Sequence, residues 1–366
     1  MRFHAAVLHG VEQPLVVEEV ELPDPGPGEV LIRNRASGLC HTDLEVIQGR
    51  MGYPFPIVLG HEGAGIVEAV GEGVTTVRTG EAVVASWNPH CGHCYYCERD
   101  EPVLCEPFRR HQPSGRMLDG GTRLTLRGAP LHHFGVVSSH AEFSIVPESG
   151  AIPIPREMPL DRACLLGCGV MTGVGAVLRL AKLARGDTMA VIGCGAVGLN
   201  AVQAGVIAGA ETIVALDRDP LRLGRAAHFG ATHTFLADDN AIAAVKACTG
   251  GRGVDAAFES AGAEGAMRLA LEIARPGGQV VILGKVPVQQ MVSFRFGSLM
   301  GEKRITRSSY GGARPSRDFP WLARLYLEGK LRLDELVTTR LPLARINEGF
   351  DAMRRGEGVR TVVELG

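Results

Sequence analysis

The alternation of strands and helices in the middle of the chain places the tightest limit on its fold. Apolar, strand-like runs at residues 188–193, 212–217, 254–259 and 279–284 are separated by Ala- and Leu-rich segments of helical length. This alternation predicts βαβ units and therefore a parallel sheet with helices on both faces. We expect an α/β fold in which a doubly wound sheet occupies residues 160–300.

A glycine-rich turn connects the first of these strands to the first helix. Residues 193–198 read GxGxxG, follow the strand at 189–192 and open a helix predicted over 196–208. The glycines permit a tight turn and a close approach of the backbone to a pyrophosphate at the positive end of the helix. A turn that merely packs tightly is the alternative. The expected cofactor contacts are Gly193, Gly195, Ala196, Val197 and Gly198.

An acidic residue ends the second strand of this segment. Asp217 lies 19 residues beyond Gly198, where a carboxylate accepts hydrogen bonds from the ribose hydroxyls of a dinucleotide. The same carboxylate repels a 2′-phosphate, so NAD is favoured over NADP. Arg218 and Arg222 weaken that preference, and Arg222 is itself a candidate cofactor contact.

The two ends of the chain have a different texture. Short strand-like runs at 30–34, 65–70 and 82–85 are separated by Gly and Pro. An amphipathic segment at 319–327 and a strand-like run at 361–365 follow residue 301. The simplest arrangement is a β-rich domain made of residues 1–159 and 301–366, with the α/β domain of residues 160–300 inserted between them.

Four of the nine cysteines lie within fifteen residues, as Cys91-x2-Cys94-x2-Cys97-x7-Cys105. Four thiolates complete a tetrahedral zinc shell with no open position, which is typical of a structural site. A four-cysteine iron–sulfur cluster is the alternative occupant. The odd cysteine count, with no secretion signal in the sequence, favours the reducing cytoplasm over a secreted disulfide scaffold.

A second group of potential metal ligands is dispersed along the chain. Cys40, His61 and Cys168 together offer two thiolates and an imidazole, the ligand set of a catalytic zinc with a fourth position open. Taken one at a time, each could instead be a buried cysteine or a hydrogen-bonded histidine. Asp43 and Glu62 are candidates to fix the tautomer of the imidazole.

Charge and hydropathy exclude several classes of protein. With 38 basic and 40 acidic side chains the net charge is −2, which argues against a protein that binds nucleic acid or a membrane surface. Residues 189–210 carry no charge and are long enough to span a bilayer. They are, however, rich in Gly and Ala and contain Asn200, Gln203 and the glycine-rich turn. We expect neither a membrane nor a nucleic-acid partner.

Several motifs occur in a characteristic order along the chain. They are CHTD at 40–43, GHEGAG at 60–65, the four-cysteine loop at 91–105, CGVMTG at 168–173 and the turn at 193–198. In this order and spacing the sequence resembles the zinc-dependent, medium-chain alcohol dehydrogenase family from end to end. Residues 109–140 are similar to the longer loop of its liver-type and thiol-dependent formaldehyde dehydrogenase branches. The resemblance implies a GroES-like catalytic domain, a Rossmann domain and an active site between them.

The resemblance also implies two zinc ions per subunit. One would be held by Cys40, His61 and Cys168, and the other by the four-cysteine loop. A catalytic zinc lowers the pKa of an alcohol hydroxyl, and the alkoxide is a better hydride donor than the alcohol. Thr42 would take the proton, while the hydride moves to NAD.

Further roles follow from the same resemblance. Thr172 would pack near the nicotinamide and the substrate, and Arg360 and His41 would contact the cofactor pyrophosphate. Subunits would pair through the cofactor domain into a homodimer or a homotetramer, and the partner of the site would be a small alcohol or aldehyde.

One position departs from the liver-type pattern. Where those relatives end a proton relay with histidine, five residues after the first zinc cysteine, this chain has Glu45. Three readings stay open. Glu45 accepts the proton, or the relay ends at the cofactor ribose and water, or Glu45 is only a solvated residue.

The resemblance places Met51, Trp87 and Phe134 along the substrate channel, and a flat aromatic wall favours aryl or allylic primary alcohols. Ordinary packing is the alternative for Trp87. Arg109 aligns with an arginine that formaldehyde dehydrogenases use for the carboxylate of a thiol adduct, although their acidic residues near Arg50 are absent here. A thiol-dependent formaldehyde dehydrogenase, an oxidoreductase with tightly bound NAD and a non-catalytic binding protein are the other hypotheses.

Overall fold

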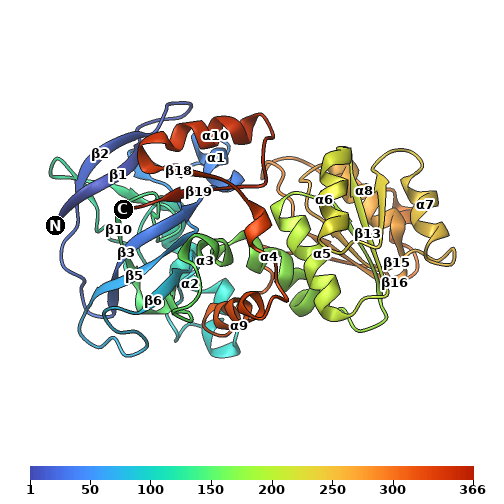
Figure 1. The fold of residues 1–366 in the computed structure, drawn as a ribbon, viewed down its shortest axis with the longest axis horizontal. Helices are drawn as coiled ribbons and strands as arrows, with labels where there is room; N and C mark the ends of the chain where they lie inside the picture. Colours follow the sequence, from blue (N-terminus) through green and yellow to red (C-terminus); the bar gives the residue numbers. More distant parts are fainter. The chain divides into compact units, whose positions relative to one another are not determined.

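The computed structural model describes all residues from 1 to 366 and divides them into two compact units. The first unit contains Met1–Cys168 and Arg314–Gly366, and the second contains Gly169–Ala313. The ribbon in Figure 1 shows the blue N-terminal strands together with the red C-terminal strands, and the yellow and orange segments together elsewhere. Both ends of the chain therefore build one unit.

Both boundaries between the units lie further along the chain than predicted. The inserted unit begins at residue 169 instead of 160, which is 9 residues later, and it ends at residue 313 instead of 300, which is 13 residues later. Helix α3 (Leu160–Ala163) and the short helix η5 (Cys164–Gly167) contact strands β3 and β5, which keeps them in the first unit. Strand β17 (Arg304–Arg307) pairs with β16, which keeps it in the second. Packing partners, which the sequence pattern does not display, set both boundaries.

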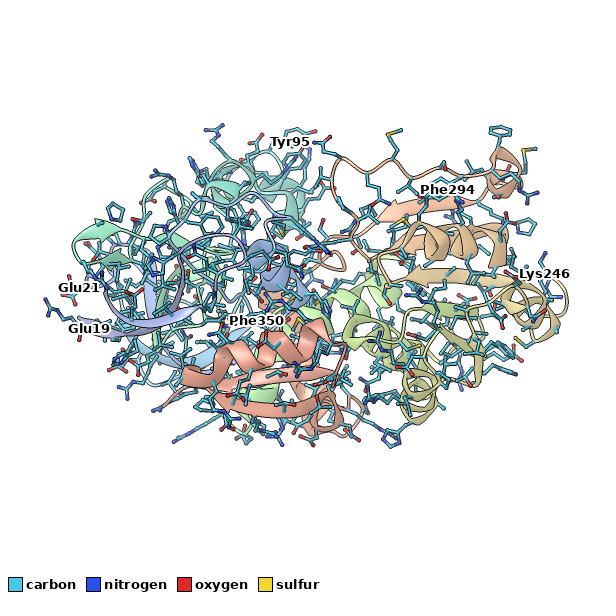
Figure 2. The ribbon with its side chains drawn as sticks, turned by 90° about the horizontal axis from the view of Figure 1, so that it is seen from above. Glu19, Glu21, Tyr95, Lys246, Phe294 and Phe350 are labelled. Atoms are coloured by element: carbon cyan, nitrogen blue, oxygen red, sulfur yellow. The ribbon has the colours of Figure 1, made fainter.

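The first unit contains two mostly antiparallel sheets. The six-stranded sheet has the order β8 (Ala129–Pro130), β7 (Thr125–Leu126), β2 (Val16–Glu21), β1 (Arg2–Leu8), β4 (Ile57–Val58) and β9 (His132–His133). The seven-stranded sheet has the order β11 (Ala151–Pro153), β6 (Ala82–Ala85), β5 (Gly63–Val70), β3 (Glu29–Gly38), β19 (Arg360–Glu364) and β18 (Val337–Pro342), with β10 (Phe143–Pro147) paired to β3. Glu19 and Glu21 of β2 project outward from this unit (Figure 2).

The C-terminal segment completes the seven-stranded sheet. Strand β19 pairs antiparallel with β3, with Val362 opposite Gly38, and β18 runs parallel to β19. Three of the four predicted runs at the two ends of the chain lie within β3, β5 and β6, and the fourth, at 361–365, overlaps β19 except for its last residue.

The helices of the first unit are α1 (His41–Ile47), α2 (Glu106–His111), α3, α9 (Pro315–Leu327) and α10 (Ile346–Arg354), with short turns η1 (Cys97–Arg99), η2 (Pro102–Leu104), η3 (Gln112–Ser114), η4 (Glu148–Gly150), η5, η8 (Asp334–Leu336) and η9 (Leu343–Arg345). The predicted amphipathic segment at 319–327 forms the second part of α9. This helix begins at Pro315 because proline lacks an N–H and is well accommodated in a first turn.

The second unit is a six-stranded parallel sheet with the order β14 (His233–Leu236), β13 (Thr212–Asp217), β12 (Thr188–Ile192), β15 (Val254–Glu259), β16 (Ala274–Ile282) and β17. The chain starts in the middle of this sheet and winds outward in both directions, which is the doubly wound order of a Rossmann fold. Strand β16 begins before the predicted residue 279 because Ala274 pairs with Val254 across an irregularity in the ladder.

The helices of the second unit are α4 (Gly169–Gly175), the π-helical η6 (Ala176–Leu180), α5 (Ala196–Ala208), α6 (Pro220–His228), α7 (Ala241–Ala247), α8 (Glu264–Ile273) and the short η7 (Phe296–Leu299). Helix α5 covers the range predicted for it. The uncharged stretch at 189–210 forms β12, the glycine-rich turn and α5.

No single helix of the protein is both long enough and apolar enough to cross a bilayer. One bent pair, Leu160–Gly167 followed by Gly169–Leu180, passes the length and composition criteria jointly.

Candidate metal and cofactor sites

Helix α1 supplies the first corner of the dispersed ligand group. Cys40 is its N-cap residue, with extended backbone angles, and the side chain of Asp43 accepts the N–H of Cys40 at 3.1 Å. This contact occupies an amide that the helix itself cannot satisfy. Leu44 and Ile47 bury the other face of the helix in an apolar cluster with Ile57, so the short helix is anchored and Cys40 is held in place.

The structure brings Cys40, His61 and Cys168 together. One potential ligand atom from each of these residues, and one from Glu62, all lie within 4.8 Å of one another. The three predicted ligands come from the start of α1, the segment before β5 and the end of η5. Two sulfur atoms and one imidazole nitrogen at this separation suit a tetrahedral zinc, in which Zn–S and Zn–N bonds are about 2.3 Å and 2.0 Å. The donor set therefore fits zinc with one position left open.

Asp43 orients the imidazole of His61. Its Oδ1 lies 3.2 Å from His61 Nδ1 and also accepts the N–H of Gly60 at 3.0 Å. With Nδ1 engaged in this way, Nε2 is the nitrogen available to a metal. The predicted role of Asp43 as tautomer-fixing partner agrees with this geometry.

The two thiols of the group lie close enough to share a proton. A hydrogen bond from Cys168 lowers the pKa of Cys40, against the opposing effect of burial, and the charge of His61 adds to the lowering. Since the thiolate is the form that binds metal, this environment favours the ligand state of Cys40.

Glu62 occupies a different place from the one expected. Its carboxylate pairs with the buried guanidinium of Arg360, the first residue of β19, and makes no hydrogen bond to the His61 ring. Burial raises the pKa of Glu62 to about 7, although the Arg360 charge opposes the shift. Of the two carboxylates expected to fix the imidazole, Asp43 does so and Glu62 instead neutralises Arg360.

This ion pair also bears on the predicted cofactor contact of Arg360. The guanidinium lies beside the metal ligands, and only 6% of the residue is exposed. One terminal nitrogen of Arg360 already donates to the Glu62 carboxylate. The contact of Arg360 with a pyrophosphate therefore stays a prediction.

The predicted proton-transfer residues Thr42 and Glu45 and the predicted pyrophosphate contact His41 lie along α1. The Cys40 thiol donates to the hydroxyl oxygen of half-buried Thr42 at 3.7 Å, which places that hydroxyl beside the ligand group. His41 is exposed at the first position of the helix. Glu45 is half-buried, and its carbonyl accepts the N–H groups of Arg50 and Met51. The relay role of the Glu45 side chain stays a prediction.

Two aromatic side chains flank His61. The ring of Phe134 meets it edge to face with centroids 5.4 Å apart, and Trp87 does so at 6.5 Å. Trp87 is half-buried, whereas Phe134 is only 2% exposed. Half-buried Met51 packs against the apolar cluster that contains Phe134. Two of the predicted pocket residues, Trp87 and Phe134, thus lie against the imidazole, and Met51 packs on the cluster behind Phe134.

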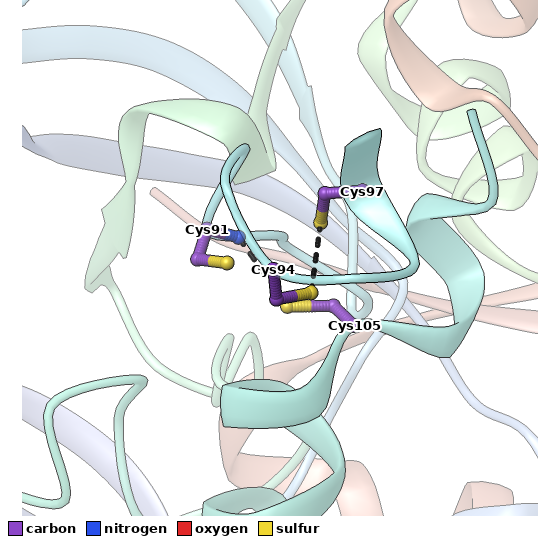
Figure 3. A group of neighbouring side chains, drawn as sticks. All are labelled: Cys91, Cys94, Cys97 and Cys105. Atoms are coloured by element: carbon purple, nitrogen blue, oxygen red, sulfur yellow. Dashed lines mark hydrogen bonds between the residues drawn. The ribbon is translucent and has the colours of Figure 1, made fainter. Parts of the chain in front are cut away.

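The four-cysteine loop folds into a compact thiol cluster. The sulfur atoms of Cys91, Cys94, Cys97 and Cys105 all lie within 4.8 Å of one another. Figure 3 shows the four side chains converging, with the Cys94 thiol donating to Cys97 at 3.5 Å. The amide of Cys91 donates to Cys105 Sγ at 3.3 Å. Four sulfurs with backbone N–H donors suit a closed, structural zinc site.

The glycine-rich turn uses its three glycines in different ways. A Cβ on Gly198 would lie 1.9 Å from the Gly193 carbonyl oxygen, and one on Gly193, whose φ is +94°, would lie 2.7 Å from the Ala261 amide nitrogen. A Cβ on Gly195 would meet no protein atom within 4 Å. The outer glycines therefore serve packing, and the middle one leaves open space at the N-terminus of α5.

That helix end has the properties of a pyrophosphate site. Gly195 caps α5 without any side-chain hydrogen bond, so the first amides, including those of Ala196 and Val197, remain available to an anion. Ser260 supports the turn from behind, because its hydroxyl donates to the Gly193 carbonyl at 2.6 Å. Sequence analysis missed Ser260, since it lies far away in the sequence and belongs to no motif.

Asp217 ends β13 as predicted and also braces the turn. Its Oδ2 accepts the Cys194 N–H at 2.7 Å, and its Oδ1 accepts the Asp219 N–H at 3.0 Å. Each oxygen retains a lone pair for a ribose hydroxyl. Arg222 pairs with Asp219 at 3.7 Å. Thr172 is buried within α4. The contact of Thr172 with the nicotinamide and the contact of Arg222 with the cofactor both stay predictions.

Two family models match successive parts of this chain. Residues 26–156 match the alcohol dehydrogenase GroES-like domain, and residues 196–328 match the zinc-binding dehydrogenase domain. The fold and the two sites thus define a zinc-binding dehydrogenase with a Rossmann cofactor domain.

Similarity over the whole chain narrows this class. The alcohol dehydrogenase class-3 of Myxine glutinosa is 41% identical over 365 residues, which cover 99% of this chain and 97% of that protein. The S-(hydroxymethyl)glutathione dehydrogenase of Haemophilus influenzae is 39% identical over 367 residues, which cover 99% and 97%. The chain belongs to the zinc-dependent, medium-chain alcohol dehydrogenase family, whose cofactors are zinc and NAD.

Solved structures agree with this assignment. An alcohol dehydrogenase zinc-binding domain protein from Burkholderia ambifaria matches with a TM-score of 0.96 and 36% identity, covering 100% of this chain and 99% of that one. Benzyl alcohol dehydrogenase from Acinetobacter calcoaceticus matches with a TM-score of 0.95 and 31% identity, covering 100% of both chains. The GroES-like and Rossmann folds implied by the sequence are therefore confirmed.

Proposed function

We propose that this enzyme interconverts a primary alcohol and its aldehyde with NAD, at a zinc held by Cys40, His61 and Cys168. The observation that carries the proposal is the convergence of these three residues, which are dispersed in the sequence, within 4.8 Å. A zinc ion bound there supplies the Lewis acidity that makes a hydroxyl group more acidic, and NAD supplies the hydride acceptor.

The protein's own side chains would position and deprotonate the substrate. The Thr42 hydroxyl, beside Cys40, would receive the proton of the alcohol and pass it outward. Asp43 would keep His61 in the metal-binding tautomer. At the other site, the open N-terminus of α5 would hold the pyrophosphate, and Asp217 would select NAD over NADP.

The first candidate substrate class is the aryl or allylic primary alcohols. Trp87 and Phe134 stand edge-on to His61, so a flat, apolar substrate would find aromatic surface next to the metal ligands. The structural match to a protein named benzyl alcohol dehydrogenase supports this class.

The second candidate is the adduct of formaldehyde with a thiol. The names of the sequence relatives, which include alcohol dehydrogenase class-3 and S-(hydroxymethyl)glutathione dehydrogenase, favour this class over the first. Arg109 and Arg110, both exposed on α2, would offer positive charge to a carboxylate of the adduct. The absence of acidic residues beside Arg50 counts against glutathione as the particular thiol.

A substrate comparison tests the proposal. Purified enzyme with NAD would be assayed on benzyl and cinnamyl alcohols, and on formaldehyde with and without glutathione and other small thiols. If formaldehyde is oxidised only with a thiol, and with a higher kcat/KM than the aromatic alcohols, the substrate belongs to the second class. If the aromatic alcohols are oxidised with the higher kcat/KM and without a thiol, it belongs to the first. A zinc-loaded protein inactive on all of them would contradict the proposal.

Two variants refine the substrate comparison. Under the adduct reading, Arg109→Ala should raise the KM for the adduct more than Arg110→Ala does, and neither should affect benzyl alcohol. Assays of the purified enzyme without added NAD, but with an artificial electron acceptor, would reveal cofactor that stays bound.

We also propose a homo-oligomer and a cytoplasmic location. All nine cysteines are free thiols, and six of them belong to the two groups of potential metal ligands. Free thiols and thiolate metal ligands are typical of proteins in a reducing compartment.

A further inference from the structure

A buried histidine behind the dispersed ligand group has no role in the chemistry above. His140 is fully buried, and its Nδ1 lies 2.8 Å from the hydroxyl oxygen of Ser37. That oxygen in turn lies 2.7 Å from the Ser139 hydroxyl. The other ring nitrogen, Nε2, has no hydrogen-bond partner and faces Asp43 Oδ2 at 4.0 Å. Buried polar atoms without partners are uncommon, so this orientation calls for a reason.

The backbone holds His140 against the segment that carries His61. The His140 N–H donates to the Leu59 carbonyl at 3.0 Å, and its carbonyl accepts the Ala6 N–H at 2.9 Å. A Cβ on Gly60 would lie 2.5 Å from the His140 amide nitrogen and 2.7 Å from its Nδ1. Only glycine at position 60, directly before His61, leaves room for this imidazole.

The His140 side chain also lies between the segments that carry Cys40 and Asp43. Ser37 lies near the end of β3, three residues before Cys40, and Asp43 lies in α1. On another side Phe350 of α10, labelled in Figure 2, meets the His140 ring with centroids 6.0 Å apart. The imidazole is thus wedged where β3, α1 and the segment before His61 meet.

The hydrogen-bond pattern accommodates a proton on the Nε2 atom of the ring. The Ser37 hydroxyl can donate to Nδ1, and it can then accept from Ser139. The ring proton then sits on Nε2, so that the N–H dipole points at the Asp43 carboxylate in surroundings of low dielectric.

We propose that His140 is a positioning residue of the zinc site: its Nε2–H holds the Asp43 carboxylate, which in turn orients His61 toward the metal. This inference concerns retention of the metal and rests on the zinc site of the proposed function. Its measurement is zinc release, so its failure is distinguishable from a failure of the alcohol chemistry.

The test is the rate at which the two zinc ions pass to a chromogenic chelator. His140→Phe keeps an aromatic ring against Phe350 but removes the N–H. Loss of a residue that contacts a metal ligand directly lowers metal affinity about 10–100-fold. His140 contacts Asp43 and not the ligand His61, so its effect should be smaller. We therefore expect about three- to tenfold faster release of one zinc, with the zinc of the four-cysteine loop unchanged as an internal standard.

A matched control separates this effect from general damage. His133 is a second buried histidine of the first unit, and its Nε2 accepts the Arg123 N–H away from Asp43. His133→Phe should leave the release rates of both zinc ions as in the wild type. Equal acceleration in the two variants would overturn the proposal.

Two further variants test the route through Asp43. His140→Gln can present an N–H to Asp43 and should restore slow release, whereas the shorter His140→Asn should not. In an Asp43→Asn background, His140→Phe should have no further effect, because coupled residues are not additive. A full effect in that background, or equal release from the Gln and Asn variants, would contradict the assignment. The Gln and Asn pair decides the matter even if the Phe variant does not fold.

Discussion

At the scale of single residues, one carboxylate carries much of the organisation of the metal site. Asp43 accepts the N–H groups of Cys40 and Gly60 and contacts the imidazole of His61. It therefore ties the start of α1 to the segment that carries the second ligand. The same residue caps a helix and orients a metal ligand, so stability and metal binding depend on it together.

Thr42 offers the clearest residue-level test of the chemistry. Thr42→Val keeps the shape of the side chain but removes the hydroxyl that would take the proton. We expect kcat/KM for alcohol oxidation to fall about 100-fold or more, the usual range for loss of a proton-transfer group. Thr42→Ser should stay within about tenfold of the wild type. Steady-state kinetics at equal zinc content would check this, and near-normal turnover by the Val variant would remove Thr42 from the reaction.

His133 links stability to pH. Burial lowers the pKa of His133 to about 3, below the ordinary value of 6.5 that the unfolded chain shows. The unfolded state therefore binds the proton first, and stability is lost as the pH falls from 6.5 toward 3. At pH 5 this histidine should account for a loss of about 2 kcal/mol.

The measurement is the midpoint of urea unfolding at pH 7 and pH 5. In His133→Gln, whose side-chain oxygen can accept the Arg123 N–H, the midpoint should fall less between the two pH values than in the wild type. An identical fall in both proteins would show that His133 is not kept neutral by burial.

At the scale of elements, the glycine-rich turn between β12 and α5 combines packing and binding at separate positions. Gly193 and Gly198 approach neighbouring backbone closely, whereas Gly195 faces open space. The GxGxxG pattern is therefore one motif with two physical requirements.

These requirements predict opposite behaviour of two alanine variants. Gly198→Ala forces a Cβ against the Gly193 carbonyl, so it should lower the melting temperature as well as NAD affinity. Gly195→Ala should melt like the wild type yet bind NAD at least about tenfold more weakly, about 1.4 kcal/mol, because the methyl group occupies the space of the pyrophosphate. Calorimetric titration and thermal melting would decide, and tight NAD binding by Gly195→Ala would contradict the assignment of the site.

The four-cysteine loop is an element whose fold depends on its metal. Cys105 is fully buried and receives the Cys91 amide, while Arg314, directly before α9, pairs with Asp100 of the loop at 2.8 Å. Cys105→Ser should reduce the zinc content from two ions per chain to one and expose residues 91–105 to proteolysis. Metal analysis with limited proteolysis would check this. A variant that keeps two zinc ions would exclude Cys105 as a ligand.

At the scale of the whole molecule, sheet edges determine what the chain can still bind. In the first unit, β19 adds the C-terminal segment to β3. In the second unit, β17 is the last strand of the parallel sheet, and all four of its residues are exposed. Large apolar side chains are also exposed in the segment of the chain that precedes it, namely Val288, Met291, Phe296 and Met300. Unprotected edges of this kind invite pairing with another chain.

We therefore expect the proposed homo-oligomer to form through the β17 edge. Light scattering should give a mass of at least twice the 38.9 kDa of the chain. Ile305→Glu together with Phe296→Glu would place charge on the β17 edge and on the exposed apolar segment before it, and should yield monomers. Glu substitution at exposed Leu221, on α6, is the control and should not change the mass. A monomeric wild-type protein would refute the expectation.

The sequence by itself determined the order of elements and the local sites. The parallel sheet, the range of α5, the glycine-rich turn, Asp217 and the four-cysteine loop all depend on residues close together in the chain, where spacing and hydrophobic period carry the information. The dispersed ligands Cys40, His61 and Cys168 have no such spacing. Their residue types suggested a zinc ligand set, and the resemblance to the family implied that the three act together.

Tertiary structure decided the features that join distant segments. It assigned Glu62 to Arg360, brought Ser260 to the turn, placed His140 behind Asp43 and set the boundaries of the two units at 168/169 and 313/314. Each of these depends on which side chains become neighbours when sheets and helices pack. A buried charge or polar group takes whichever partner the fold brings within reach, and that choice is not encoded in local spacing.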